Sequence, residues 1–325
     1  MKAMILAAGF GTRLFPLTID RTKPAIPFLG KPLVGYVAEY VAGYGFDHVV
    51  VNLHHQPESV KKALGDGGDF GVNIHYTLES PEILGTAGAL DNARDLLQDE
   101  TFLIVNGKII TDIDLNAALK THRESGAIAT MVLKPNLGRE KFTMIETENG
   151  CVKGFGSFPQ AAEYYEQIPL MFTGIHILEP EVFDYIPRGI YSDILPVFYR
   201  PALEKGVRVA AHVTEDRWFE LSTIQRYLDI SLAMLEGKSK GIFTGNQNRI
   251  ANNAEVSDSI LWDNVTIENR AKLYRTIIAD GVTIKSGEYF ENAAIVRADM
   301  VRGTIIPEKA PKGSFVGDNY VVKLI

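Results

Sequence analysis

Glycines and cations that could bind a polyphosphate follow the first apolar run of the chain. Gly9 and Gly11 carry no side chain, so backbone N–H groups near them can approach phosphate oxygens. Arg13 and Lys23 can neutralise the charge of such a ligand. The alternative is a glycine-rich turn with two solvated cations, because short glycine patterns are weak signals. These residue types therefore indicate phosphate chemistry at one local site.

The strand before this segment must position it. Up to about Gly126, short apolar runs alternate with helical patterns. Four such units predict an α/β domain, a doubly wound and mostly parallel sheet with helices on both faces. Ligands bind at the carboxyl ends of such strands, and the corner-rich segments here directly follow strands. The units are KAMILAAG with PLVGYVAEYVAGYG, HVVVNL with ESVKKALGD, NIHYTL with TAGALDNARDLL, and TFLIVNG with DLNAALKTHRESG.

A repeat of 17 residues follows Gly237. Its three copies begin at Ala254, Ala271 and Glu288, and each carries single apolar positions at near-hexad spacing. This spacing is typical of a β-solenoid, in which each coil buries its apolar face by stacking on the next. The sequence therefore predicts two domains.

The predicted division is residues 1–237 and 238–325. Three coils leave much of their flanks apolar, and Trp262, Tyr274 and Tyr289 have little core to enter. We therefore expect the second domain to form a homo-oligomer.

Composition excludes several classes of protein. A net charge of −7 over 325 residues argues against nucleic acid or an anionic membrane as a partner. No apolar run approaches the roughly 20 residues of a membrane span, and no charged and apolar leader precedes the first strand. The single cysteine, Cys151, rules out an internal disulfide and fits a reducing compartment. The expected location is the cytoplasm.

The whole opening string resembles a family signature. It matches G-x-G-T-R-L-x-P-L-T followed by K-P, the signature of the sugar-1-phosphate nucleotidyltransferases, or nucleotide-sugar pyrophosphorylases. A second segment, Leu84 to Ala89, looks like the base-binding turn of that family. The tail is similar to that of mannose-1-phosphate guanylyltransferases and related glucose enzymes. The matching residues of the first string are Gly9, Gly11, Thr12, Arg13, Leu14, Pro16, Leu17, Thr18, Lys23 and Pro24.

This resemblance implies a Rossmann-like nucleotidyltransferase domain followed by a short left-handed β-helix. The implied reaction is attack of a sugar 1-phosphate oxygen on the α-phosphorus of a nucleoside triphosphate, which gives a nucleotide-sugar and pyrophosphate. Catalysis is expected from an arginine, a lysine and magnesium held by two aspartates, with Thr173 and Gly174 beside the sugar. The nucleotide-binding residues carried over are Leu6, Ala7, Ala8, Gly9, Gly11, Thr12, Arg13, Gly85, Thr86, Asn106 and Gly107.

The acidic positions depart from the family pattern. Where N-G-D is expected the chain has Asn106-Gly107-Lys108, and an ammonium cannot coordinate magnesium. In the second position, W-x-D-x-G-T, the carboxylate is that of Glu220, which is the remaining candidate metal ligand. Lys108 joins Arg13 and Lys23 as a candidate catalytic residue. Asp112 and Asp114 are predicted to cap the next helix.

The sugar side departs as well. The family's E-K-P appears as Ser157-Phe158-Pro159, and its Y-G as Phe142-Thr143. Its N-A-G-I is Phe172 to Ile175, so that Thr173 and Gly174 alone carry over.

Two functional hypotheses follow. The first is a working transferase in which Lys108 supplies charge beside the phosphates where a metal would otherwise sit. The second is a degenerate relative that binds nucleotide or nucleotide-sugar as a sensor or regulatory subunit. The base and sugar stay open, with guanine and mannose favoured by the tail. The dehydrogenase motif G-x-G-x-x-G needs a third glycine, which this chain lacks, and the coils show no obvious catalytic histidine of an acyltransferase. Metal binding by His54 and His55 is a minor alternative.

Overall fold

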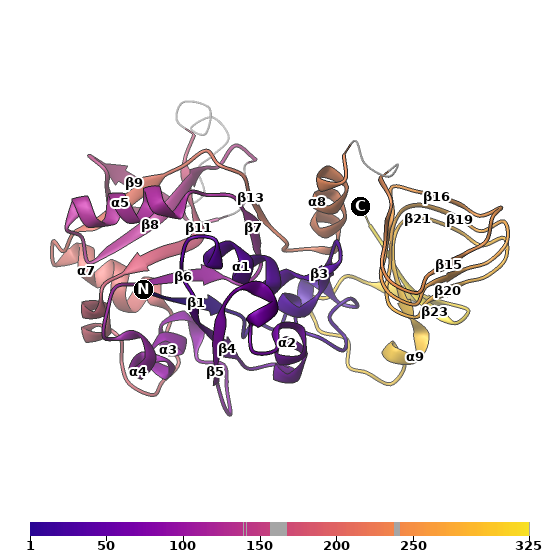
Figure 1. Ribbon diagram of the computed structural model, residues 1–325, viewed down its shortest axis with the longest axis horizontal. Coiled ribbons are helices and arrows are strands. Elements are labelled where there is room, and N and C mark those ends of the chain that lie inside the picture. Colours follow the sequence, from indigo (N-terminus) through magenta and orange to yellow (C-terminus); the bar gives the residue numbers. More distant parts are fainter. Residues whose placement is uncertain (139, 141, 157–167, 237–240, 325) are drawn as a thin grey trace. The chain divides into compact units, whose positions relative to one another are not determined.

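The computed structural model describes residues 1–138, 140, 142–156, 168–236 and 241–324 (Figure 1). The chain forms two compact units. The first, called here the sheet unit, comprises Met1–Ala8, Val34–Pro57 and Leu64–Trp218; the second, the solenoid unit, comprises Gly9–Leu33, Glu58–Ala63 and Phe219–Ile325. Residues Gly9–Leu33 thus group with the C-terminal part of the chain, although they lie near its start.

A nine-stranded sheet forms the centre of the sheet unit, in the order β5-β4-β1-β6-β11-β8-β12-β10-β9. The first four of these strands are parallel, as predicted from the alternating units. Further along, β11 runs antiparallel to both β6 and β8, so the complete sheet is mixed. The strands are β1 (Lys2–Leu6), β4 (His48–Leu53), β5 (Asn73–Leu78), β6 (Phe102–Asn106), β8 (Ala129–Pro135), β9 (Met144–Glu148), β10 (Cys151–Gly156), β11 (Leu170–Leu178) and β12 (Val209–Val213).

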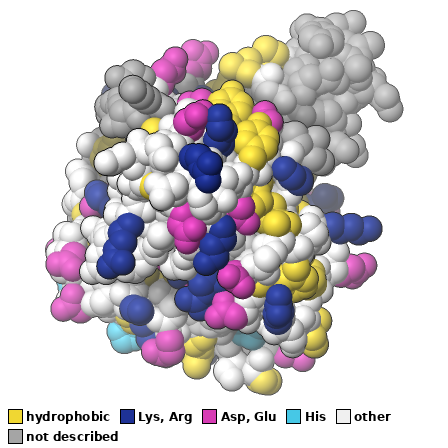
Figure 2. Space-filling model, turned by 90° about the vertical axis from the view of Figure 1, so that its right-hand side faces the viewer, with side chains coloured by type: hydrophobic (Ala, Val, Ile, Leu, Met, Phe, Trp, Pro, Cys, Tyr) yellow, Lys and Arg dark blue, Asp and Glu magenta, His cyan; other side chains and the backbone are white. Residues whose placement is uncertain are grey.

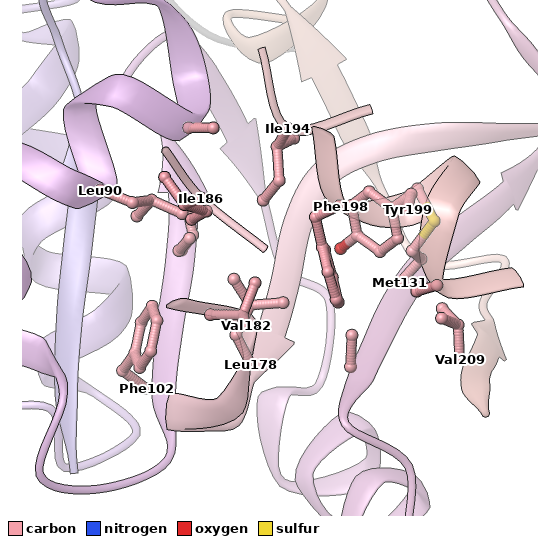
Figure 3. Close-up of a cluster of buried hydrophobic side chains, with 14 of the residues drawn as sticks. Leu90, Phe102, Met131, Leu178, Val182, Ile186, Ile194, Phe198, Tyr199 and Val209 are labelled. Carbon is pink, nitrogen blue, oxygen red and sulfur yellow. The ribbon is translucent and has the colours of Figure 1, made fainter. Parts of the chain in front are cut away.

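Helices cover both faces of this sheet. Successive strand residues point to opposite faces, and consecutive residues of β1, β4, β6 and β8 are buried, so both faces are apolar. On one face, Met131 belongs to a buried cluster with residues of the helical segments that follow β5 and β11 (Figure 3). On the other face, His122 of α5 bonds to Thr130, the neighbour of Met131 in β8. The helices are α1 (Leu33–Ala42), α2 (Pro57–Leu64), α3 (Gly85–Asn92), α4 (Arg94–Leu97), α5 (Leu115–Ser125), α7 (Arg200–Glu204), α8 (Ile224–Met234) and α9 (Ala298–Val301).

The cluster in Figure 3 packs helical segments against one face of the sheet. Phe198 and Tyr199 lie in a π-helix, Leu195–Tyr199, and their rings are 4.7 Å apart. The buried Tyr199 hydroxyl lies 2.6 Å from Nδ1 of His176, and burial lowers the pKa of His176 to about 3. This histidine is therefore a neutral hydrogen-bonding residue of the core.

The solenoid unit confirms the 17-residue repeat. Lys272 pairs in parallel with Glu255 on one side and with Tyr289 on the other, which is one repeat in each direction. The strands are β14 (Phe243–Thr244), β15 (Arg249–Ile250), β16 (Glu255–Ser257), β17 (Ile260–Leu261), β18 (Thr266–Ile267), β19 (Lys272–Ile278), β20 (Thr283–Ile284), β21 (Tyr289–Arg297), β22 (Gly313–Val316) and β23 (Asn319–Lys323).

The two ends of the solenoid sheet differ. Antiparallel β23 pairs with β21, and β22 pairs with β23, so added strands cover the last coil.

Tyr274 and Tyr289 are exposed, as expected, but the prediction for Trp262 is wrong. Its ring is only 3 % exposed, and its indole N–H donates to the Tyr227 hydroxyl of α8. The sequence pattern of the coils did not reveal this partner, which lies 35 residues away in the chain.

Short elements complete the description. They are η1 (Thr12–Leu14), η2 (Lys23–Ala25), β2 (Pro27–Phe28), β3 (Lys31–Pro32), η3 (Gly68–Phe70), β7 (Ile109–Thr111), η4 (Pro180–Asp184) and β13 (Trp218–Glu220). Across the described ranges, no helix has the length and apolar character that crossing a membrane would require.

Candidate functional site

Three parallel strands of the sheet unit end at the same level. Leu6 pairs with Asn52 on one side and with Asn106 on the other, so the residues after β1 and β6 emerge together. The N–H of Gly107 donates to the Leu6 carbonyl at 3.0 Å. An added Cβ at Gly107 would lie 2.9 Å from that oxygen, which explains the glycine. Ala7, Ala8, Asn106 and Gly107 are thus brought together as predicted for one edge of the sheet.

The predicted sugar-binding pair lies beside Asn106. Gly174 has φ +81°, and a Cβ there would overlap the Asn106 side chain, so only glycine fits. Thr173 is fully buried; its hydroxyl donates to Val132 at 2.8 Å, and its carbonyl accepts the indole N–H of Trp218 at 2.8 Å. The Thr173 side chain is therefore used within the protein, and its part in sugar binding stays a prediction.

The turn at Gly85 begins α3 and is packed against Ser192–Ile194. The N–H groups of Ala87 and Gly88 both donate to the Ser192 carbonyl, at 2.9 and 3.0 Å. Gly85 has φ +73°, and a Cβ there would lie 2.7 Å from the same carbonyl. The Thr86 hydroxyl accepts the Ile194 N–H at 2.8 Å. Packing within the protein thus accounts for the residue types at Gly85 and Thr86.

A buried chain of hydrogen bonds joins this turn to the end of β1. Asn52 accepts the Ala7 N–H at 2.8 Å, and its side-chain N–H donates to Glu79 at 2.5 Å. The second oxygen of the Glu79 carboxylate accepts the Leu84 N–H at 2.6 Å. Asn52 is 3 % exposed and Glu79 is 2 % exposed. These two residues fix the backbones of both predicted nucleotide-binding segments in the sheet unit.

Sequence analysis did not single out Asn52 or Glu79. The available signal was a polar residue near the carboxyl end of an otherwise apolar strand, together with an acid shortly before the glycine turn. His54, part of the minor metal alternative, has Nδ1 at 2.9 Å from the Glu79 carbonyl. Burial and the neighbouring His54 lower the pKa of His55.

The glycine loop belongs to the solenoid unit. Gly9 and Arg13 are exposed, and within the described chain an added Cβ at Gly9 would meet no atom closer than 4 Å. Gly11 differs, because it has φ +67° and a Cβ there would lie 2.9 Å from Cβ of Lys23. Its carbonyl also accepts the Thr18 hydroxyl at 3.3 Å. The loop is therefore closed at Gly11 and open at Gly9, with Thr12 and Arg13 following in η1.

Lys23 and Glu220 lie together in the same unit. Nζ of Lys23 is 4.0 Å from Oε1 of Glu220, and both residues are buried. The Glu220 backbone carbonyl accepts the Arg226 guanidinium at 2.9 Å. The acid at the second family position is thus beside a lysine, and the pair places charges of opposite sign at the base of the loop.

The nucleotidyl transferase family model matches residues 2–237. The chain belongs to this family. A second model, the GlmU-like C-terminal hexapeptide, matches residues 236–308 and identifies the coils as a left-handed β-helix. The predicted order of a doubly wound nucleotidyltransferase domain and a β-helix is confirmed.

Relatives of this nucleotidyl transferase are sugar-1-phosphate enzymes. The UTP–glucose-1-phosphate uridylyltransferase of Synechocystis is 33 % identical over 87 % of this chain and 76 % of its own length. The N-acetylmuramate alpha-1-phosphate uridylyltransferase of Neisseria meningitidis is 34 % identical over 70 % of this chain and 95 % of its own. Mannose-1-phosphate guanylyltransferases are also among the relatives, as the resemblance implied.

A solved structure agrees on the fold. The putative glucose-1-phosphate thymidylyltransferase of Bacillus anthracis, crystallised with a sucrose, superposes with a TM-score of 0.62. It is 21 % identical and covers 74 % of this chain and 96 % of its own. At that identity the likeness shows the fold of the nucleotidyl transferase and nothing finer.

The family's magnesium arrangement does not fit the residues of this nucleotidyl transferase. Lys108, half-buried between β6 and β7, offers an ammonium where the family has a carboxylate. Asp112 is taken by Arg217, whose backbone N–H and Nε donate to it at 2.8 and 2.6 Å. Among the described residues, no group of three or more Asp, Glu, His or Cys side chains is arranged to hold a metal ion.

The two predicted helix caps have different outcomes. Asp114 is the N-cap of α5 and accepts the N–H groups of Asn116 and Ala117, as predicted. For Asp112 the prediction is wrong, because its carboxylate binds Arg217, far away in the sequence.

Phe142, from the altered Y-G position, packs edge-on to Trp218 with centroids 6.0 Å apart. The altered E-K-P position, residues 157–159, lies outside the described residues.

Proposed function

We propose that this chain joins a nucleoside triphosphate and a sugar 1-phosphate to give a nucleotide-sugar and pyrophosphate. A phosphate oxygen of the sugar 1-phosphate bonds to the α-phosphorus, and the bond from that phosphorus to the bridging oxygen breaks, releasing pyrophosphate. Such a transfer needs positioning and charge neutralisation rather than covalent help. The observation that carries the proposal is the glycine loop, which is open at Gly9, held at Gly11 and followed by the exposed Arg13.

We assign the roles residue by residue. Arg13 and Lys23 neutralise the triphosphate, and backbone groups of Leu6–Thr12 bind its oxygens. The half-buried turn at Gly85 and Thr86 binds the base through backbone groups, since the Thr86 hydroxyl accepts the Ile194 N–H. Backbone groups at Asn106–Gly107 complete the nucleotide contacts. Gly174 lets the sugar approach the backbone, and the buried Thr173 positions Trp218 beneath it.

Lys108 replaces charge that the family obtains from magnesium. An ammonium gives a point charge for phosphate oxygens and needs no carboxylate pair. Glu220 is the one family-like carboxylate left, but its neighbour is the Lys23 ammonium at 4.0 Å. No step of the proposed reaction therefore passes through a metal held by these residues.

The substrates are a finer question. The relatives that are 33 % and 34 % identical are both uridylyltransferases, which makes UTP the first nucleotide to test. Guanine with mannose, favoured by the tail, is the next pair. We test pyrophosphate release with four nucleoside triphosphates and several hexose 1-phosphates, with and without magnesium. Release with one pair supports the proposal, and absence of both release and nucleotide-dependent thermal stabilisation contradicts it.

The second hypothesis, a sensor or regulatory subunit, stays a prediction that rests on the residue type at Lys108 alone. If Lys108 supplies the charge, turnover persists in excess chelator and Lys108→Ala lowers it by roughly 10²–10³, the effect of one lost electrostatic stabiliser. A wild type that binds nucleotide but turns over no pair supports the sensor. Activity that depends fully on magnesium contradicts the role of Lys108.

Restoring the acids separates these candidates further. Lys108→Asp combined with Glu220→Asp recreates the carboxylate pair of the family. A decayed site would gain magnesium-dependent turnover, whereas an enzyme that relies on Lys108 would lose activity, because a negative charge then stands beside the triphosphate. Lys108→Met removes the charge while keeping the side-chain length, and serves as the matched control.

We also propose that residues 1–237 and 238–325 are separate domains and that the β-helix forms a homo-oligomer. Figure 2 shows one face of the molecule, with hydrophobic side chains among charges of both signs. Tyr289 is 59 % exposed and Tyr274 is 40 % exposed. Light scattering on the full chain and on a Tyr274→Ser, Tyr289→Ser variant tests this. An oligomer that the variant converts to monomer supports it, and a wild-type monomer contradicts it.

A further inference from the structure

The segment Asp20–Pro27, which carries Lys23, is tied to the β-helix by Arg21. Its guanidinium donates to the Asp20 carboxylate through Nε at 2.8 Å and Nη2 at 3.0 Å. The same Nη2 donates to Asp280, in the turn after β19, at 2.7 Å. The guanidinium carbon also lies 5.3 Å from the ring centroid of Trp262. One side chain thus joins the segment to two coils.

The coil side of this contact is itself fixed. The other oxygen of the Asp280 carboxylate accepts the backbone N–H of Asp263 at 3.0 Å. Asp263 lies one repeat earlier and makes the same kind of bond, accepting the Asn246 N–H at 2.7 Å. Each acid therefore joins its own coil to the preceding coil. Asp280 differs in that its second oxygen holds Arg21.

A second tie lies on the other side of Lys23. Trp262 donates its indole N–H to the Tyr227 hydroxyl at 3.0 Å, and that hydroxyl donates to the Pro27 carbonyl at 2.5 Å. The ring of Tyr227 also packs edge-on against Phe28, with centroids 5.6 Å apart. Arg21 and Pro27 bracket η2, so Trp262 contacts one end of the turn through Arg21 and is linked to the other end through Tyr227.

Electrostatics strengthen the first tie. Burial on its own would lower the pKa of Arg21, but the hydrogen bonds and charges of Asp20 and Asp280 outweigh it and raise the pKa above its ordinary value. The side chain of Arg21 is 20 % exposed and that of Asp280 is 35 % exposed. The charges are therefore partly shielded from water, where such a pair is screened less than on an open surface.

We propose that Asp280 and Trp262 of the β-helix are positioning residues for Lys23. They hold the segment Asp20–Pro27 so that the lysine keeps one place at the base of the glycine loop. The β-helix thus serves the reaction directly, in addition to any role in assembly. The kinetic consequence rests on the proposed function, but the structural consequence does not.

The test compares Asp280→Asn with Asp263→Asn in the full chain. Both variants make the same change in the same column of the coils, and an asparagine oxygen can keep the bond to the preceding coil. Only Asp280→Asn removes the charge that faces Arg21. Arg21→Lys is a second variant, because an ammonium cannot bridge two carboxylates and cover an indole as a guanidinium does.

Hydrogen exchange is measured for Ala25 and Ile26, whose N–H groups bond to Thr22 and Lys23 in η2. We expect exchange there to rise about tenfold in Asp280→Asn and Arg21→Lys, and to stay at the wild-type rate in Asp263→Asn. With active enzyme, we expect kcat/KM for the nucleotide to fall by about tenfold, with Tm equal to that of the control.

Each result decides the matter. Equal exchange in Asp280→Asn and Asp263→Asn overturns the proposal, whether or not the chain is an active transferase. Faster exchange with unchanged kcat/KM overturns the positioning role of Asp280. If the wild type turns over no substrate pair, the proposed function fails, and the exchange comparison alone supports or overturns the tie. Should Asp280→Asn not fold, Arg21→Lys provides the same comparison.

Discussion

The two glycine-rich segments differ in what their glycines face. In the turn at the start of α3, Gly85 and Gly88 face backbone oxygens of Ser192 and Ile190, at 2.7 and 2.9 Å from an added Cβ. In the glycine loop, Gly11 faces Lys23, but Gly9 faces open space. A glycine in a family motif therefore has one of two causes, packing inside the protein or room for a ligand. Of these four glycines, Gly9 alone has open space at its Cβ position, and there we expect the ligand.

The largest effect is expected at Gly85. Gly85→Ala forces a side chain into a left-handed conformation and against a backbone carbonyl that cannot rotate away. We expect the free energy of unfolding in urea to fall by about 3 kcal/mol. Gly126→Ala is the matched control, because Gly126 has φ +60° but open space around its Cβ position. It isolates the conformational cost, about 1 kcal/mol. Equal losses in the two variants would show that Ser192 does not constrain Gly85.

Gly11→Ala should cost somewhat less. Gly11 has φ +67°, and its nearest neighbours are side-chain atoms of Lys23 and Thr18 at 2.9 and 3.2 Å. We expect the free energy of unfolding to fall by about 2 kcal/mol, with a loss of turnover, because the displaced atom is the Cβ of Lys23. A stability no lower than that of Gly126→Ala would contradict the packing of Gly11 on Lys23.

This comparison also shows what the sequence could predict. The 17-residue repeat and the four parallel strands depend on local periodicity, so they were predictable from the residues alone. The antiparallel β11 was not, because it depends on pairing with β8 between residues that lie 35 (Leu170 with Pro135) to 49 (Leu178 with Ala129) apart in the chain. The same holds for Asp112, whose partner Arg217 is 105 residues away, and for Trp262, which is buried by Tyr227.

The residues of the candidate site also fall into those that the sequence predicted and those that it did not. Residue types at Gly9, Gly11, Arg13 and Lys23 indicated phosphate binding without any structure. Asn52 and Glu79 were missed, since their role lies in bonds to Ala7 and Leu84 that no spacing rule connects. A motif identifies residues that contact a ligand more readily than the buried groups that hold them in place.

Gly9→Ala should leave stability unchanged and weaken nucleotide binding. The space around its Cβ position predicts a change in unfolding free energy within about 0.5 kcal/mol. A methyl group there would keep phosphate oxygens from the backbone, and we expect Kd for the nucleotide to rise about tenfold. Calorimetric titration with UTP and GTP measures this. Unchanged affinity for every nucleotide that the wild type binds would place the phosphates elsewhere.

The smallest effect is expected at Thr86, whose hydroxyl accepts the Ile194 N–H and whose backbone we expect to bind the base. Thr86→Val keeps the shape but leaves the Ile194 N–H without its 2.8 Å acceptor. We expect a loss of about 1 kcal/mol in unfolding free energy. Thr86→Ser, which keeps the hydroxyl, should lose less than half of that. Nucleotide Kd should change less than about twofold in both variants, because neither alters the backbone of the turn. A valine variant that is stable but binds nucleotide poorly would show that the hydroxyl contacts the base. The turn that begins α3 would then differ from the glycine loop only in the packing of Gly85.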